Sequence, residues 1–176
     1  MRKSFALTLS SVAFVMAGVA WAEDAPPPTD PQIAQIAVVA NTIDIDAGKL
    51  AGEKAQDAGA KELAAMMVRD HTAVNEKAAA LVKKLGVTPE ESDTSKTLKE
   101  NGDKELEKLR KLSGPQFDKE YVDNEVAYHQ AVIDVVSKTL IPNTKNPELK
   151  KLLEDAAPIF KAHLEHAKMV QAGLKK

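Results

Sequence analysis

Apolar side chains recur at alternating intervals of three and four residues in four separate stretches of this sequence. The first such series is Ile33, Ile36, Ala40, Ile43, Ala47 and Leu50. Narrow stripes of this kind, sustained over several heptads, are typical of helices that pack side by side in an antiparallel bundle. No stretch alternates apolar and polar residues as a half-buried strand does, so the sequence predicts an all-α fold.

Capping residues mark where the predicted helices begin and end. Asp30 is a suitable N-cap, followed by Pro31 at the first helical position, and Asn146 with Pro147 repeats this arrangement. Gly86 is a typical residue after a helix C-terminus. The four main helices are therefore expected over about residues 30–50, 61–85, 116–139 and 146–174.

The connection between the second and third main helices is long and highly charged. Thr88-Pro89-Glu90-Glu91 has the form of a capping box, and residues 92–112 predict one or two short amphipathic helices around an Asn101-Gly102 break. A connection of this length lets the third main helix run parallel to the second, as in ferritin-like bundles with one crossover. We therefore predict a ferritin-like four-helix bundle with extra short helices in this connection.

The N-terminus has the features of an export signal. Arg2 and Lys3 precede an apolar run over residues 5–20, and Ala20-Trp21-Ala22 places small residues where a signal peptidase cleaves. This run of 16 residues is shorter than the roughly 20 that a membrane-spanning helix needs. We expect a signal peptide over residues 1–22, cleavage after Ala22, a Pro-rich leader over 23–29, a helical domain over 30–175 and a periplasmic location.

Charge and composition exclude several classes of function. Removing Arg2 and Lys3 leaves 22 basic and 26 acidic side chains, a net charge of −4, which disfavours nucleic acid as a partner. Cysteine is absent, so disulfides, thiolate metal sites and cysteine nucleophiles are excluded. No later segment is apolar enough to span a membrane, and no phosphate-binding loop or nucleophile motif indicates an enzyme. A protein partner or a homo-oligomer remains open.

Three of the four histidines lie on predicted inward-facing stripes, one on each of three helices: His71, His129 and His163. Glu125 lies one turn before His129 on the same stripe, and Asp44 lies at the edge of the first stripe. Burying an unpaired ionisable group is costly, so such residues tend to pair with one another or to bind a metal. These five residues are the candidate metal ligands.

Asp70, beside His71, and His166, one turn beyond His163, are further candidates for this cluster. A more ordinary interpretation stays open, in which the histidines are hydrogen-bonded core residues and Glu125 with His129 is a common i, i+4 pair.

The residue three positions before each histidine limits which kind of metal site the cluster can form. A di-iron carboxylate centre uses Glu-x-x-His on two helices. The residues three positions before the four histidines are instead Val68, Val126, Phe160 and His163. A single divalent transition metal (zinc, copper or iron) is expected, and zinc or copper suits these ligands best.

Several motifs together resemble the exported bacterial family called domain of unknown function 4142. They are Met67-Val68-Arg69-Asp70-His71-Thr72-x-x-Asn75, Phe117-Asp118-x-x-Tyr121-Val122, His129-Gln130, Asn146-Pro147-Glu148-Leu149-Lys150 and Pro158-x-x-x-x-His163-Leu164. The likeness spans about residues 31–172. It implies a ferritin-like bundle in the periplasm with no established activity. Of the family's recurrent positions, His71, His129 and His163 are matched, whereas Asp44 stands where family members tend to have Glu.

Two hypotheses about function follow. The first is an exported bundle that binds a divalent transition metal through its His/carboxylate cluster. The second is a non-enzymatic interaction or stress-related structural protein, whose buried polar cluster only fixes helix packing.

Overall fold

The computed structural model describes residues 26–174, so the predicted signal peptide lies outside the described residues. Within this range the chain is almost entirely helical and contains no strand. The elements are α1 (Asp30–Lys54), α2 (Ala58–Leu85), α3 (Asp93–Lys111), α4 (Gly114–Val135), the π-helical turn η1 (Val136–Leu140), α5 (Ile141–Asn143) and α6 (Pro147–Leu174). The predicted all-α fold is confirmed.

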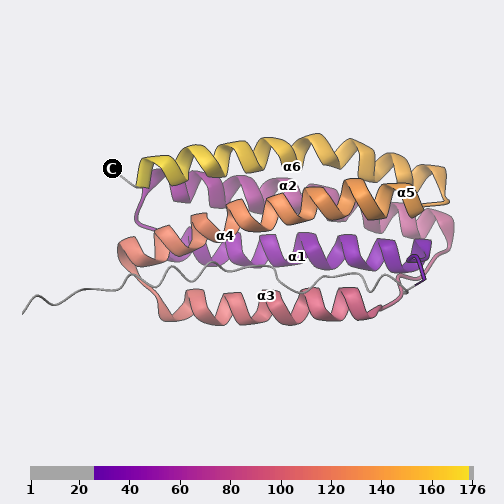
Figure 1. Cartoon of the computed structure of the whole chain (residues 1–176), viewed down its shortest axis with the longest axis horizontal. Coiled ribbons are helices and arrows are strands. Elements are labelled where there is room, and N and C mark those ends of the chain that lie inside the picture. Colours follow the sequence, from indigo (N-terminus) through magenta and orange to yellow (C-terminus); the bar gives the residue numbers. More distant parts are fainter. Residues whose placement is uncertain (1–25, 175–176) are drawn as a thin grey trace, which may run out of the picture.

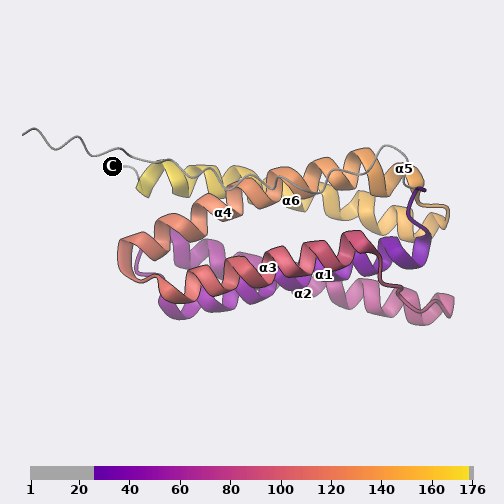
Figure 2. The same ribbon diagram turned by 60° about the horizontal axis from the view of Figure 1, so that its bottom comes forward.

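Helices α1, α2, α4 and α6 form the four-helix bundle, and α3 lies along the outside of α1 (Figure 1). In the turned view, α4 and α6 form one layer and α1 and α2 form the other, with α3 beside α1 (Figure 2). Because α3 runs the length of the bundle, it returns the chain to the end at which α2 began. Helix α4 therefore runs parallel to α2, which is the predicted one-crossover, ferritin-like topology.

The connection between α2 and α4 contains a single 19-residue helix that continues through Asn101-Gly102. Glycine is needed here for packing, since a Cβ at Gly102 would lie 2.6 Å from Cγ1 of Ile43 on α1. The absence of a side chain lets α3 approach α1 closely. The predicted break at this dipeptide is wrong for that reason.

Helix α3 occupies the predicted stretch 92–112, but its cap is not the predicted one at Thr88. Its N-cap is Ser92, whose hydroxyl accepts from the backbone N–H of Ser95, while Ser95 Oγ accepts from the N–H of Ser92. The Thr88 segment is not helical, and the N–H of Glu90 donates to the carbonyl of Pro31 at 3.1 Å. This contact holds the segment against the start of α1, so the predicted capping box at Thr88 is wrong.

The start of α1 is capped by Thr29 instead of Asp30, in a reciprocal capping box with Gln32. The carboxylate of Asp30 instead accepts from the backbone N–H groups of Lys145 and Asn146, at 2.9 and 2.8 Å. Asp30 therefore connects the start of α1 to the start of α6. Asn146 caps α6 as predicted, since its Oδ1 accepts two N–H groups of the first turn.

The core consists of two apolar regions. One, which we call the small-residue region, contains Ala47, Ala51, Ala55, Ala60, Leu63, Ala64, Met67, Leu106, Leu109, Phe117, Tyr121, Val122 and Ala167. The other, which we call the large-residue region, contains Ile33, Ile36, Val74, Leu98, Tyr128, Val136, Leu140, Leu149, Leu153, Ala156 and Phe160. On each bundle helix, one buried ionisable residue lies between the two regions: Asp44, His71, Glu125 and His163.

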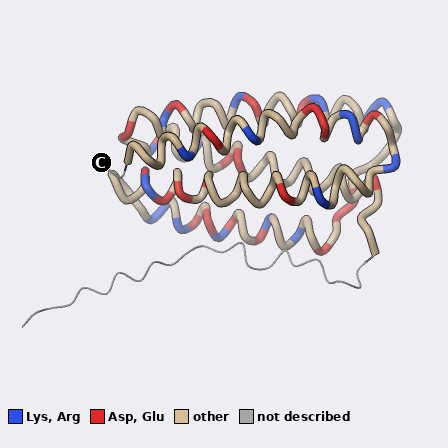
Figure 3. The backbone as a smooth tube through the Cα atoms, turned by 45° about the horizontal axis from the view of Figure 1, so that its top comes forward, with Lys and Arg blue, Asp and Glu red and all other residues tan. Residues whose placement is uncertain are grey.

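Charged side chains of both signs alternate along the helices (Figure 3). Several form pairs one turn apart, such as Lys119 with Asp123 and Lys151 with Asp155. Across residues 26–174, no helix combines the length and the hydropathy needed to cross a membrane.

Candidate metal centre

Each helix of the bundle contributes to one buried polar layer. Asp44 comes from α1, His71 from α2, Glu125 and His129 from α4, and His163 from α6. All five side chains are at most 2% exposed. The structure thus brings together every residue that the sequence proposed as a main ligand, because one position on each inward stripe falls at the same depth in the bundle.

Three imidazole nitrogens converge at the centre of this layer. His129 Nε2 lies 3.4 Å from His71 Nε2 and 3.3 Å from His163 Nδ1. A tetrahedral ion bound at about 2.0–2.1 Å separates its nitrogen ligands by about 3.3–3.4 Å. Two of the three nitrogen–nitrogen separations therefore match that spacing, and all three nitrogens lie within 4.8 Å of one another.

Hydrogen bonds on the outer side of two rings direct their lone pairs inward. The Nδ1–H of His71 donates to Asn41 Oδ1 at 2.7 Å, and the amide of Asn41 donates in turn to Asn75 Oδ1 at 3.0 Å. The Nε2–H of His163 donates to the Asp70 carboxylate at 3.0 Å. Because these outer nitrogens hold the protons, His71 Nε2 and His163 Nδ1 are unprotonated and face the centre.

His129 is held in the same way from within its own helix. Its Nδ1–H donates to the backbone carbonyl of Glu125 at 3.1 Å, and the Glu125 carboxylate lies 3.4 Å from the same nitrogen. Asp44 Oδ2 lies 3.4 Å from His71 Nε2. A carboxylate oxygen therefore lies beside the three converging nitrogens.

Burial and neighbouring charges separate the pKa values of the three histidines. Burial opposes the charged form of His129, but the negative charges of Asp44 and Glu125 outweigh it and raise its pKa to about 9. Burial, with the nearby charges of His129 and His163, lowers the pKa of His71 to about 2. Burial also lowers the pKa of His163, against the Asp70 carboxylate. One proton on His129 thus supplies the positive charge among the three imidazoles at neutral pH.

Asp44 and Glu125 form a carboxyl pair beside His129. Burial raises the pKa of Asp44 well above its usual range, and the negative charge of Glu125 raises it further, against the positive charge of His129. Asp44, Glu125 and His129 form a second group whose ligand atoms all lie within 4.8 Å of one another. The layer thus contains two donor groups that have His129 in common.

The further candidates have different positions. Asp70 is half-buried and orients His163, and its pKa falls to about 2 because Arg69 donates to its carboxylate. His166 is half-buried and belongs to neither donor group. Asn41 and Asn75 also belong to the site, although they were not predicted as site residues from the sequence. Asn41 lies three residues before Asp44, so a polar residue one turn away on a buried face was the available signal.

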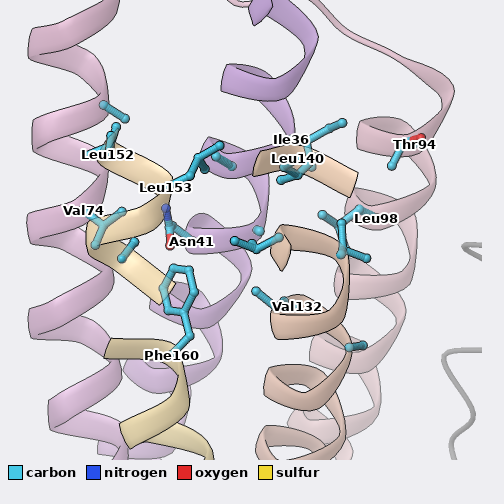
Figure 4. A pocket seen from close by; sticks show the side chains of 17 residues that line it. Ile36, Asn41, Val74, Thr94, Leu98, Val132, Leu140, Leu152, Leu153 and Phe160 are labelled. Atoms are coloured by element: carbon cyan, nitrogen blue, oxygen red, sulfur yellow. The ribbon is translucent and has the colours of Figure 1, made fainter. Parts of the chain in front are cut away.

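An apolar cavity of about 60 Å³ borders the layer on the side of the large-residue region (Figure 4). Its walls include Asn41 and Phe160, both of which contact His71, since the ring of Phe160 stacks on the imidazole with centroids 5.4 Å apart. Val136 and Leu140 of the π-helical turn also line it. This side of the centre is therefore covered by hydrocarbon.

The sequence matches the family model described as Domain of unknown function (DUF4142) over residues 16–170. The chain belongs to this family. No curated protein matches it.

Two solved structures share the fold. The crystal structure of a DUF305 fragment from Deinococcus radiodurans aligns with a TM-score of 0.69 and 16% identity, covering 84% of this chain and 99% of that one. The structure of CopM in the Cu(II)-bound form aligns with a TM-score of 0.64 and 19% identity, with the same coverage of each chain. At these identities the likeness shows the fold alone.

Proposed function

We propose that this protein binds a divalent transition metal ion through His71 Nε2, His129 Nε2 and His163 Nδ1. The observation that carries the proposal is the convergence of these nitrogens at 3.3 and 3.4 Å, with every opposite ring nitrogen donating to an oxygen. Metal-ligating histidines are held in this manner in proteins generally. If the cluster only fixed helix packing, three ring nitrogens that are unprotonated, or whose proton a metal can replace, would not need to face one point.

Zinc and copper fit this donor set best. Three imidazoles with a carboxylate suit zinc in tetrahedral geometry, and copper(II) has the highest affinity of the divalent first-row ions for such ligands. The shared fold with CopM, whose structure is described as Cu(II)-bound, makes copper a natural ion to test. Iron is less suited, because the chain lacks the Glu-x-x-His pairs of di-iron centres.

The surroundings of the centre favour binding over catalysis. Asp44 Oδ2, 3.4 Å from His71 Nε2, supplies a fourth ligand, which closes the coordination of a tetrahedral ion. Catalytic zinc sites keep a position open for water or substrate, whereas structural sites are closed. We therefore propose a non-enzymatic metal-binding protein.

Metal content tests this proposal. The protein, purified without a His tag, is exposed to equimolar zinc, copper, iron and manganese, desalted, and analysed by mass spectrometry for metals. We expect at least one zinc or copper per chain, lost in His71→Ala and in His163→Ala. His166→Ala is the matched control, because this histidine lies outside both donor groups, and it should retain the metal.

A ratio well below one ion per chain, or an equal loss in His166→Ala, would contradict metal binding. The polar layer would then be explained by the second hypothesis, in which it only fixes helix packing.

We further propose that the chain is exported to the periplasm. The support is the basic start, apolar run and Ala-x-Ala site at the N-terminus, in the sequence alone. N-terminal sequencing of protein from the periplasmic fraction of expressing bacteria should begin at Glu23. Recovery of chains that still carry residues 1–22 in the soluble fraction would contradict it.

A further inference from the structure

Several buried polar atoms beside His129 have no hydrogen-bond partner among the described residues. Both carboxylate oxygens of Glu125 and the hydroxyl of Tyr121 are in this group, and Glu125 is 0% exposed. Tyr121 lies one turn before Glu125 on α4, close enough for the charges of Glu125 and Asp44 to act on its hydroxyl. Unpaired buried polar groups are rare in proteins, and several at one place indicate a bound water or ion.

One of the unpaired oxygens, Glu125 Oε2, lies on the Nδ1 side of His129, away from the nitrogen that faces the other two histidines. His129 Nε2 faces His71 and His163, whereas His129 Nδ1 lies 3.4 Å from Glu125 Oε2. An imidazole presents its two nitrogens in different directions, so one ring can contact two ions. Asp44 belongs to one donor group with Glu125 and His129, and its Oδ2 also lies 3.4 Å from His71 Nε2.

We propose that a second divalent cation binds between Asp44, Glu125 and His129, so that the His129 imidazole connects two metal ions. This inference rests on the proposed function, since it takes the ion held by the three histidines as the first one. The second site offers the Glu125 carboxylate, the oxygen of Asp44 that does not face the first ion, one ring nitrogen and the Tyr121 hydroxyl. Such an oxygen-rich set with one imidazole suits a first-row divalent cation such as zinc or copper, and no anion.

The protons balance as follows. The second ion takes the place of the proton that Nδ1 donates to the Glu125 carbonyl, and that proton leaves to solvent. Both carboxylates bind in the ionised form. No electron transfer is involved.

Stoichiometry is the test. Full-chain protein is titrated with zinc, and bound metal is measured after desalting. We expect two zinc ions per chain in the wild type and one in Glu125→Gln, which keeps the shape of the side chain and removes its charge. Glu105→Gln is the matched control, because Glu105 is another buried glutamate whose carboxylate oxygens accept no hydrogen bond among the described residues, and this variant should still bind two.

Copper gives an independent measurement. Two copper(II) ions connected by one imidazole couple magnetically, so the wild type should show less paramagnetic resonance intensity than its copper content. Glu125→Gln should restore one full signal per chain. If that variant fails to fold, Tyr121→Phe serves instead, and it should weaken the second binding step by about tenfold or more while leaving the first unchanged.

The outcomes separate the two proposals. No bound metal in the wild type would overturn the proposed function and this inference together. One ion per chain, unaffected by Glu125→Gln, would keep the proposed function and overturn the second site, leaving water as the partner of Glu125 and Tyr121.

Discussion

The polar layer and the two apolar regions beside it are built from the same helices, yet they make opposite contributions to stability. The small-residue region gains free energy from every buried methyl and methylene group, at roughly 25 cal/mol per Å². The polar layer buries five ionisable side chains, and removing such groups from water costs several kcal/mol each before their mutual attraction is counted.

This difference indicates why the polar layer exists. A bundle that needed only stability would carry leucine at these five positions, because apolar replacements of buried ion pairs are often neutral or stabilising. The apolar regions therefore supply the free energy of folding that offsets the cost of burying the ligands. The predictions below test this division.

The largest effect is expected in the small-residue region. Phe117→Ala should lower the free energy of unfolding by about 3–5 kcal/mol, because it removes a fully buried aromatic ring and leaves a cavity. Urea denaturation with zinc and with a chelator should give the same loss. A loss confined to one of the two conditions would mean that this region and the metal centre are not independent.

The second effect is specific to the polar layer. Zinc or copper at a hundredfold excess over its dissociation constant should stabilise the wild type by about 2.7 kcal/mol. His71→Ala should abolish this gain, and His166→Ala should keep it. Thermal unfolding with and without metal measures both, and an undiminished gain in His71→Ala would exclude this residue as a ligand.

The third effect tests how His163 is oriented. Asp70→Ala removes the acceptor of the His163 Nε2–H, so metal affinity should fall 10- to 100-fold. Arg69→Ala is the control, because Arg69 is exposed and its guanidinium donates to Asp70 without touching the histidine hydrogen bond, and affinity should barely change. Calorimetric titration of both variants with zinc measures the two affinities. A metal affinity of Asp70→Ala equal to that of Arg69→Ala would show that Asp70 has no orienting role.

The smallest effect is the pH dependence of the metal-free protein. The pKa of His129 is raised to about 9 in the folded chain, above the ordinary 6.5, so its contribution to stability is complete below pH 6.5 and is lost as the pH rises to 9. The pKa of His71 is lowered to about 2, so its contribution is complete above pH 6.5 and declines as the pH falls below that value.

Metal-free protein should therefore be most stable near pH 6.5 and lose on the order of 1 to 2 kcal/mol by pH 9. Bound zinc takes the place of the proton, so the decline above pH 6.5 should disappear in the loaded protein. Urea denaturation between pH 5 and 9 measures this, and a metal-free stability that rises through pH 9 would contradict the account of His129.

The sequence predicted much of the fold and the main site because both depend on helical periodicity. His71, His129 and His163 take stripe positions that apolar residues otherwise fill, and the register of a packed bundle brings such positions to one depth. The capping motifs at Gly86 and Asn146 act locally, so they were also predictable.

The remaining features depend on contacts between distant parts of the chain. In the sequence Gly102 is typical of a helix break, but in the structure it gives room to Ile43 of α1. Asp30 is likewise typical of an N-cap, but its carboxylate accepts from the N–H groups of Lys145 and Asn146. The hydrogen bond from His71 to Asn41 likewise depends on how α1 and α2 pair. Such contacts decide which ring nitrogen holds a proton, and periodicity carries no information about that.

The most direct test of the metal centre is the X-ray absorption spectrum of the zinc-loaded protein. We predict a first shell at about 2.0–2.1 Å, with the outer-shell scattering of about three imidazoles per ion in Glu125→Gln, where only the first site is filled. A shell of oxygen ligands without imidazole scattering, or zinc that washes out before measurement, would contradict the central claim that His71, His129 and His163 bind the ion.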